Sequence, residues 1–221
     1  MKAALYIQKF KIFAWEFFAI ALMMPLLLGN LSLVYSQEEH AKQDHAGHHE
    51  HHMAVAAKRY ISNLTSYVIP EVMLVESDGS EKLLSEAIDS SKAVMLNFIF
   101  TTCTAICPTM SATFAQVSNQ MASDKETIQL ISISVDPEHD TPEMLTKYAK
   151  KFMAGPEWRL FTGTSNNSIL AQRAFDAYRG DKMNHLPLFF IHAPGSEKWV
   201  RIEGLVSADE LITEYRMLAG K

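Results

Sequence analysis

The chain has 221 residues, a formal net charge of −5 and 48% hydrophobic residues, which is enough for one domain with a sizeable core and excludes a generally disordered, low-complexity protein. Its lysines and arginines are scattered and form no basic stripe with interleaved aromatic residues, so we expect no nucleic-acid partner. The only two cysteines, Cys103 and Cys107, are too few for a disulfide scaffold, and their closeness in sequence indicates a site.

The first 36 residues have the pattern of an export segment. Three lysines precede an apolar run over residues 12–35. The segment is either a signal peptide, with Val34 and Ser36 at the small-residue positions of a cleavage site, or a membrane anchor, because residues 17–35 approach the ~20 residues that a spanning helix needs. In both cases the lysines on the starting side place the rest of the chain outside the cytoplasm.

Residues 37–59 form a histidine-rich segment, which we expect to be a flexible tether because it has no apolar periodicity. It holds six of the nine histidines: His40, His45, His48, His49, His51 and His52. The segment either captures metal ions weakly, since imidazole suits copper, zinc and nickel, or serves as an ordinary polar spacer. Interspersed histidines behind a natural-looking leader argue against a cloning tag.

The folded domain is predicted from residue 60 to residue 221. A strand is expected over 68–76, with a turn at Asp78-Gly79 before a short return, and a short helix over 83–88. Residues 93–100 give the strongest strand signal, because a continuous apolar run of this length is typical of a central strand covered on both faces.

Helices and strands then alternate along the chain. The expected elements are a helix over 108–121, a strand over 128–135, a helix capped by Thr141 with Pro142 in its first turn, a strand over 158–162 and a helix over 168–178. A hairpin over 188–192 and 199–202 follows, and then a last helix whose capping box is Ser207 and Glu210. This order predicts an α/β protein with a thioredoxin-like fold, a central mixed sheet flanked by helices.

The two cysteines lie where the predicted central strand ends and a helix begins. Ligands bind at the carboxyl ends of strands in such sheets, and a helix N-terminus favours thiolates. Because Cys103 and Cys107 are four residues apart, both sulfur atoms can reach one metal ion, or they can close a disulfide if the turn distorts. Copper(I) and disulfide exchange both require thiolates, so both interpretations remain open.

A third metal ligand would come from a histidine outside the tether. His139 is in a polar loop, and His192 is inside an apolar strand, where we expect it to be a packed residue. His185 lies in the loop before the hairpin, and in a thioredoxin-type fold that loop faces the cysteine turn. His185 is therefore the candidate ligand.

Three sequence features, spread over about residues 66–205, resemble the Sco (SenC/PrrC) family. They are FTTCTAICP at 100–108, SVDPEHDTP at 134–142 and His185 before the final hairpin. The resemblance implies one copper ion, Cu(I) or Cu(II), held by Cys103, Cys107 and His185, with a supporting role for Asp136. It also implies a metallochaperone that helps to assemble the copper centre of cytochrome c oxidase.

The same resemblance implies the location and the partners. We expect a protein on the periplasmic side of the bacterial inner membrane, attached through the N-terminal segment if that is not cleaved, or secreted. The expected partners are a cytochrome c oxidase subunit or another copper acceptor, and a thiol reductant. Some bacterial relatives act mainly as thiol–disulfide oxidoreductases, and here Cys103 would be the attacking thiol and Cys107 the resolving one.

One departure from the family pattern favours that redox alternative. The family usually has Asp-His-Ser or Asp-His-Thr at the histidine, whereas this chain has Asn184-His185-Leu186-Pro187. Thioredoxins place a cis-proline at this point, packed against the active-site cysteines. Pro187 is the candidate for that role, and it leaves the three copper ligands in place.

Overall fold

The computed structural model describes residues 59–124 and 126–221. The predicted signal peptide or anchor and nearly all of the histidine-rich tether lie outside these residues. Within the described part of the chain, no helix is both long enough and apolar enough to cross a membrane.

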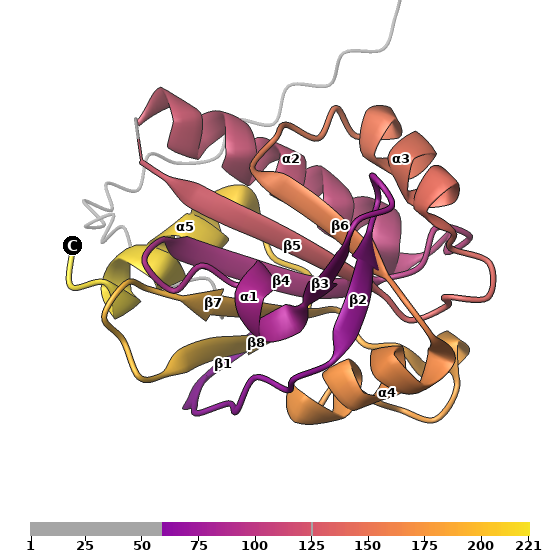
Figure 1. The fold of residues 1–221 in the computed structure, drawn as a ribbon. Coiled ribbons are helices and arrows are strands. Elements are labelled where there is room, and N and C mark those ends of the chain that lie inside the picture. The colour runs from indigo at the N-terminus through magenta and orange to yellow at the C-terminus, as the bar shows by residue number, and fades with distance from the viewer. Residues whose placement is uncertain (1–58, 125) are drawn as a thin grey trace, which may run out of the picture. The chain divides into compact units, whose positions relative to one another are not determined.

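An eight-stranded mixed sheet forms the centre of the described domain, in the order β1-β8-β7-β4-β5-β6-β2-β3 (Figure 1). The neighbours β4, β5 and β6 run parallel, and every other pair is antiparallel. The strands are β1 (Ile61–Thr65), β2 (Met73–Glu76), β3 (Glu81–Leu83), β4 (Ala93–Ile99), β5 (Ile128–Ser134), β6 (Trp158–Thr162), β7 (Leu188–His192) and β8 (Trp199–Glu203).

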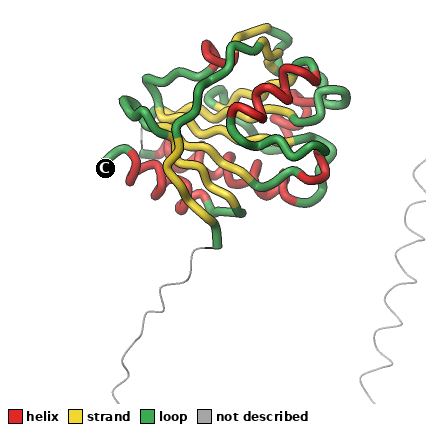
Figure 2. The backbone as a smooth tube through the Cα atoms, turned by 90° about the horizontal axis from the view of Figure 1, so that it is seen from below, coloured by secondary structure: helices red, strands yellow, loops and turns green. Residues whose placement is uncertain are grey.

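Helices cover both faces of this sheet (Figures 1 and 2). The helical elements are α1 (Leu84–Ala87), α2 (Ile106–Ser123), α3 (Pro142–Lys151), α4 (Ser165–Ala174), the 3₁₀ turn η1 (Lys182–Asn184) and α5 (Ala208–Leu218). One hydrophobic core joins α2, α3 and α5 to one face, and a second core joins α1 and α4 to the other. The predicted α/β thioredoxin-like fold, a mixed sheet flanked by helices, is confirmed.

The two central strands are buried along their whole length, as their apolar runs predict. Successive side chains point to opposite faces, so Met95 joins the core beneath α2 and Leu96 joins the core on the other face. Both faces therefore need apolar residues. This explains why residues 93–99 are nearly continuous in hydrophobicity rather than alternating.

Side-chain caps set the starts of the helices. The Thr141 hydroxyl accepts a hydrogen bond from the amide of Met144, and Ser207 forms the predicted capping box with Glu210. The helix expected over 168–178 begins earlier, at Ser165, because the side chain of Thr164 caps it. It also ends earlier, and the chain turns at Asp176 with a positive φ of 50°.

The N-terminal part of the domain differs from the sequence prediction. The strand expected over 68–76 is confined to Met73–Glu76, since Pro70 has no N–H to donate to a ladder. An unpredicted strand, β1, instead pairs with β8 at one edge of the sheet. Hydroxyl groups of Tyr60 and Ser62 donate to the carboxylate of Glu214, which ties this edge to α5.

Candidate functional site

Three loops leave the sheet at the same end, on the right in Figure 1. Parallel β4 and β5 finish side by side, with Ile99 opposite Ser134. Strand β7 is antiparallel to β4, so it starts where β4 finishes, and Phe189 lies opposite Asn97. The topology therefore gathers the cysteine loop, the loop after β5 and the loop that carries His185.

Cys103 lies just before α2 and is partly exposed, with a free thiol. Burial on its own raises the pKa of this thiol, but backbone N–H groups of Cys107, Ala105 and Ile106, together with the Cys107 thiol, act in the opposite direction. The net effect is a lowered pKa for Cys103. This is the stabilisation of a thiolate by the free amides of a helix N-terminus that the sequence predicts.

Cys107 lies in the first turn of α2 and is fully buried, also as a free thiol. Burial strongly raises its pKa, a backbone hydrogen bond with Phe100 opposes the rise, and the neighbouring Cys103 and the charge of Asp140 add to it. The two thiols are therefore unequal. As the pH rises, Cys103 ionises before Cys107, and the Cys107 thiol stays protonated at neutral pH.

His185 follows η1 and is half-buried against the side chain of Phe100, with ring centroids 6.4 Å apart. Burial lowers the pKa of His185 to about 4, and a hydrogen bond with the backbone of Phe98 opposes this shift. The imidazole is therefore neutral near pH 7. Its Nε2 atom is one of seven buried side-chain atoms without a hydrogen-bond partner among the described residues.

The donor set fits a soft metal ion, because two thiols and a neutral imidazole are ligands that copper(I) accepts. The structure brings the two cysteines together and places His185 beside Phe100, three residues before Cys103. It does not bring the three side chains into one cluster. In the described residues no group of three or more His, Cys, Asp or Glu side chains is close enough to hold a metal ion.

Asp136 lies in the loop after β5, beside the loop of His185. Its carboxylate accepts hydrogen bonds from Lys182 Nζ at 2.5 Å and pairs with His139 Nδ1 at 3.0 Å. Burial raises the pKa of Asp136, but Lys182 and His139 lower it more, so its net pKa is below the ordinary value. Sequence reasoning missed Lys182, whose one signal is a positive charge three residues before the candidate ligand.

The expectation of a cis-proline at Pro187 is wrong. All peptide bonds in the described ranges are trans. Pro187 instead begins the hairpin, and its carbonyl oxygen accepts a hydrogen bond from the amide of Gly204, 2.9 Å away. His192 is the packed residue that its apolar strand predicts, because it lies against Trp199, with ring centroids 4.9 Å apart.

Comparison with known proteins places the chain in a family. The sequence is 28% identical over 166 residues to the SCO1 protein homolog of Bacillus subtilis (strain 168), which covers 71% of this chain and 85% of the relative. BsSco, described as having a disulfide switch and as a member of the Sco family of cytochrome c oxidase assembly proteins, superposes with a TM-score of 0.60 at 25% identity, over 72% of this chain and 98% of BsSco.

Arabidopsis thaliana ScoI with copper bound shares the fold, with a TM-score of 0.56 at 23% identity over 68% of this chain and 99% of that structure. The SCO1/SenC family matches residues 66–219, which extends the resemblance seen in the sequence through the last helix. The chain belongs to the SCO1/SenC family.

Proposed function

We propose that this protein is a copper-binding metallochaperone that helps to assemble the copper centre of cytochrome c oxidase. Cys103, Cys107 and His185 hold the ion, and Asp136 supports the loop that carries His185. Membership of the SCO1/SenC family supports this function. BsSco is described as belonging to a family of cytochrome c oxidase assembly proteins, and Arabidopsis ScoI has been solved with copper bound.

The buried, unpartnered Nε2 atom of His185 is the observation that carries the proposal. Seven buried side-chain atoms of the described residues have no hydrogen-bond partner, and His192 Nδ1 is one of them. The His185 nitrogen supports the proposal because its ring lies against Phe100, three residues before Cys103, where a bound ion would satisfy it. A neutral imidazole is also the form that binds a metal ion, and the lowered pKa of His185 keeps it neutral at pH 7. The cysteine loop follows Phe100 directly in the sequence and provides the thiolates.

Each donor contributes differently to copper binding. Cys103 is partly exposed and has the lower pKa, so its sulfur is the entry point for the ion. Cys107 is buried and loses its proton only in exchange for the metal. His185 completes the set after its loop adjusts towards the sulfur atoms. Release to an acceptor would occur by exchange of these ligands for the acceptor's own.

The remaining parts of the chain fit a membrane-side role. Residues 1–36 act as a signal peptide or anchor, and residues 37–59 act as a tether, so that residues 60–221 work outside the cytoplasm on the periplasmic side. The proposed partners are an oxidase subunit or another copper acceptor, and a thiol reductant that keeps both cysteines reduced.

A thiol–disulfide oxidoreductase is the second candidate function. The observation that favours it is the inequality of the thiols, since a lowered pKa suits an attacking thiol and burial suits a resolving one. The disulfide switch in the description of BsSco is consistent with it. The trans peptide bond of Pro187 removes one argument for this candidate.

The affinity of the reduced protein for copper(I), measured anaerobically on residues 60–221, separates the two functions. Tight one-to-one binding that is lost in both His185→Ala and Cys103→Ser supports the metallochaperone. A copper(I) affinity that is the same in His185→Ala as in the wild type, together with a cysteine pair that still exchanges with a dithiol, supports the oxidoreductase. His192→Ala is the matched control, because it removes an imidazole that packs on Trp199 away from the cysteine loop.

A further inference from the structure

Asp140 is a fully buried carboxylate in the loop between β5 and α3, and nothing in the proposed ligand set accounts for it. Its Oδ1 atom accepts a hydrogen bond of 2.5 Å from the Thr101 hydroxyl, and its Oδ2 atom accepts one of 2.6 Å from the Ser134 hydroxyl. The Thr101 amide also donates to both oxygen atoms, at 3.2 and 3.1 Å.

These contacts join the two central strands at the point where each one ends. Ser134 is the last residue of β5, and Thr101 follows the end of β4 by two positions and precedes Cys103 by two. The carboxylate therefore holds the first residue of the cysteine loop by both its backbone and its side chain. Hydrogen bonds to a charged group are about twice as strong as neutral ones, so the bonds from Thr101 to the Asp140 carboxylate fix the position of Thr101 strongly.

The charge of Asp140 is stabilised by neutral donors, in contrast to that of Asp136, which is paired with Lys182. A buried charge acts over a longer range than an exposed one because water screens it less. The field of Asp140 reaches Cys107 and Tyr148, whose pKa values it raises. A negative charge at this place also attracts a cation held at the two sulfur atoms.

We propose that Asp140 is the positioning residue of the cysteine pair: it fixes the start of the Cys103–Cys107 loop through Thr101, and its buried charge favours Cu(II) over Cu(I) at the sulfur atoms. The second part follows because the two ions differ by one positive charge. The inference rests on the proposed function, since it concerns copper at these thiols, but the positioning of the loop exists without any metal.

Three variants separate position from charge. Asp140→Asn keeps the shape and removes the charge, whereas Thr101→Val removes one hydrogen bond to the loop and keeps the charge. Ser134→Ala is the control, because it removes a 2.6 Å bond to the same carboxylate without touching the cysteine loop, against 2.5 Å for the bond from Thr101. It also removes the acceptor of the Asp136 amide, which lies in the loop after β5. All three are made in the full chain, so that the tether histidines are the same throughout.

The first readout uses metal-free, reduced protein and measures hydrogen exchange of the Thr101 and Cys103 amides. Exchange should be about tenfold faster in Thr101→Val and in Asp140→Asn than in the wild type, which corresponds to one hydrogen bond, and nearly unchanged in Ser134→Ala. Equal exchange in all four proteins would overturn the positioning role. If Asp140→Asn fails to fold, the comparison of Thr101→Val with Ser134→Ala still decides it.

The second readout is the ratio of Cu(II) to Cu(I) affinity. Cu(II) is followed by the sulfur-to-copper charge-transfer absorption, which tether histidines do not produce, and Cu(I) by competition with a chromogenic chelator. The ratio should fall about tenfold in Asp140→Asn and stay constant in Thr101→Val. An unchanged ratio in folded Asp140→Asn would overturn the charge effect. A wild-type protein that binds no copper would overturn the proposed function and leave the exchange measurement to judge the positioning.

Discussion

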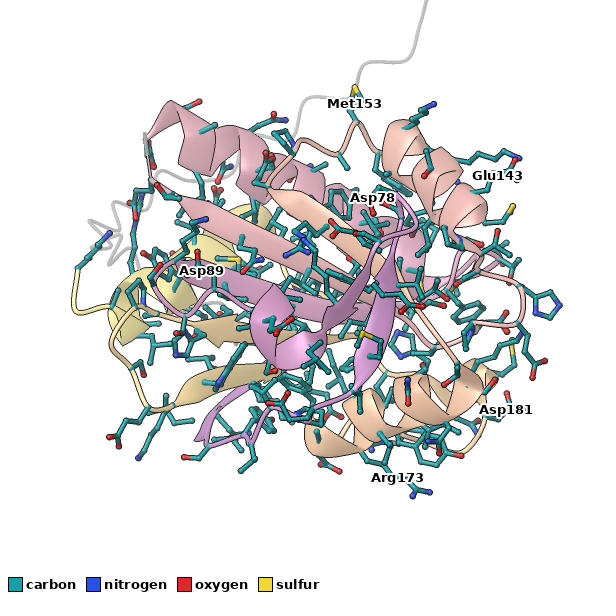
Figure 3. The ribbon with its side chains drawn as sticks, in the orientation of Figure 1. Asp78, Asp89, Glu143, Met153, Arg173 and Asp181 are labelled. Carbon is teal, nitrogen blue, oxygen red and sulfur yellow. The ribbon has the colours of Figure 1, made fainter. Side chains whose placement is uncertain are left out.

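The Nζ atom of Lys182 donates a hydrogen bond to the Oδ2 atom of Asp136 across 2.5 Å, and this contact joins the loop after β5 to the turn that leads to His185. Asp136 is almost fully buried, and Lys182 also lies over the ring of Phe100, 5.9 Å from its centroid. Asp181, labelled in Figure 3, precedes Lys182. It caps η1 by accepting a hydrogen bond from the amide of Met183. The position of His185 therefore depends on contacts of the residues before it.

Replacing Lys182 with methionine should raise the pKa of Asp136 and loosen the loop of His185. Burial alone raises that pKa, and Lys182 is the larger of the two neighbours that hold it below the ordinary value. A carboxyl-carbon NMR titration measures the pKa, and amide exchange over residues 181–185 measures the loop. Lys198→Met, in the exposed turn of the hairpin, is the matched control and should change neither quantity.

Alkylation should distinguish the two cysteines. At pH 7 Cys103 should react with iodoacetamide at least about tenfold faster than Cys107, because its pKa is lowered and its sulfur is accessible, whereas burial protects Cys107. The rates are measured by mass spectrometry on the reduced protein, with Cys103→Ser and Cys107→Ser identifying each site. Equal rates in the folded protein would contradict the assignment of Cys103 as the entry point.

The free energy of unfolding of the metal-free domain should fall as the pH is lowered, and part of this fall should depend on His185. The pKa of His185 is about 4 in the folded protein against an ordinary value of 6.5, so protons bind the unfolded chain more readily. The stabilisation is complete above about pH 6.5 and is lost as the pH falls through 4, by at most about 3 kcal/mol. Urea unfolding at pH 7 and pH 4.5 measures the difference, which should shrink in His185→Gln. A pH dependence that His185→Gln leaves unchanged would show that other groups cause it.

Removing the hydroxyl of Tyr148 should destabilise the base of the cysteine helix. This hydroxyl is hydrogen-bonded to Ser111 Oγ at 2.7 Å and donates to the carbonyl oxygen of Cys107 at 3.4 Å. Tyr148→Phe should lower the free energy of unfolding by about 1 to 2 kcal/mol, since it leaves buried polar atoms without partners. Ser111→Ala together with Tyr148→Phe should cost less than the two single changes combined. Strict additivity would mean that the two hydroxyl groups do not interact.

Much of the fold could be predicted from local patterns. The strands at 93–99 and 128–134 follow from apolar runs that both faces of a sheet require, and the caps at Thr141 and Ser207 follow from short-range hydrogen bonding. The strand β1 could not be found this way, because three of its five side chains are exposed, none is buried, and its stability comes from pairing with β8.

For the candidate site too, some features follow from local sequence patterns and others only from the tertiary structure. The sequence by itself determined that Cys103 and Cys107 lie at a strand–helix junction, because the spacing of apolar residues places both elements there. Only the tertiary structure decided which carboxylate is paired with Lys182 and which one holds Thr101, and that the bond before Pro187 is trans. Asp140 and Thr101 are 39 positions apart, and their contact depends on the parallel register of β4 and β5. Both strands are buried on both faces, so their sequences lack the alternation of apolar and polar residues that would mark the register.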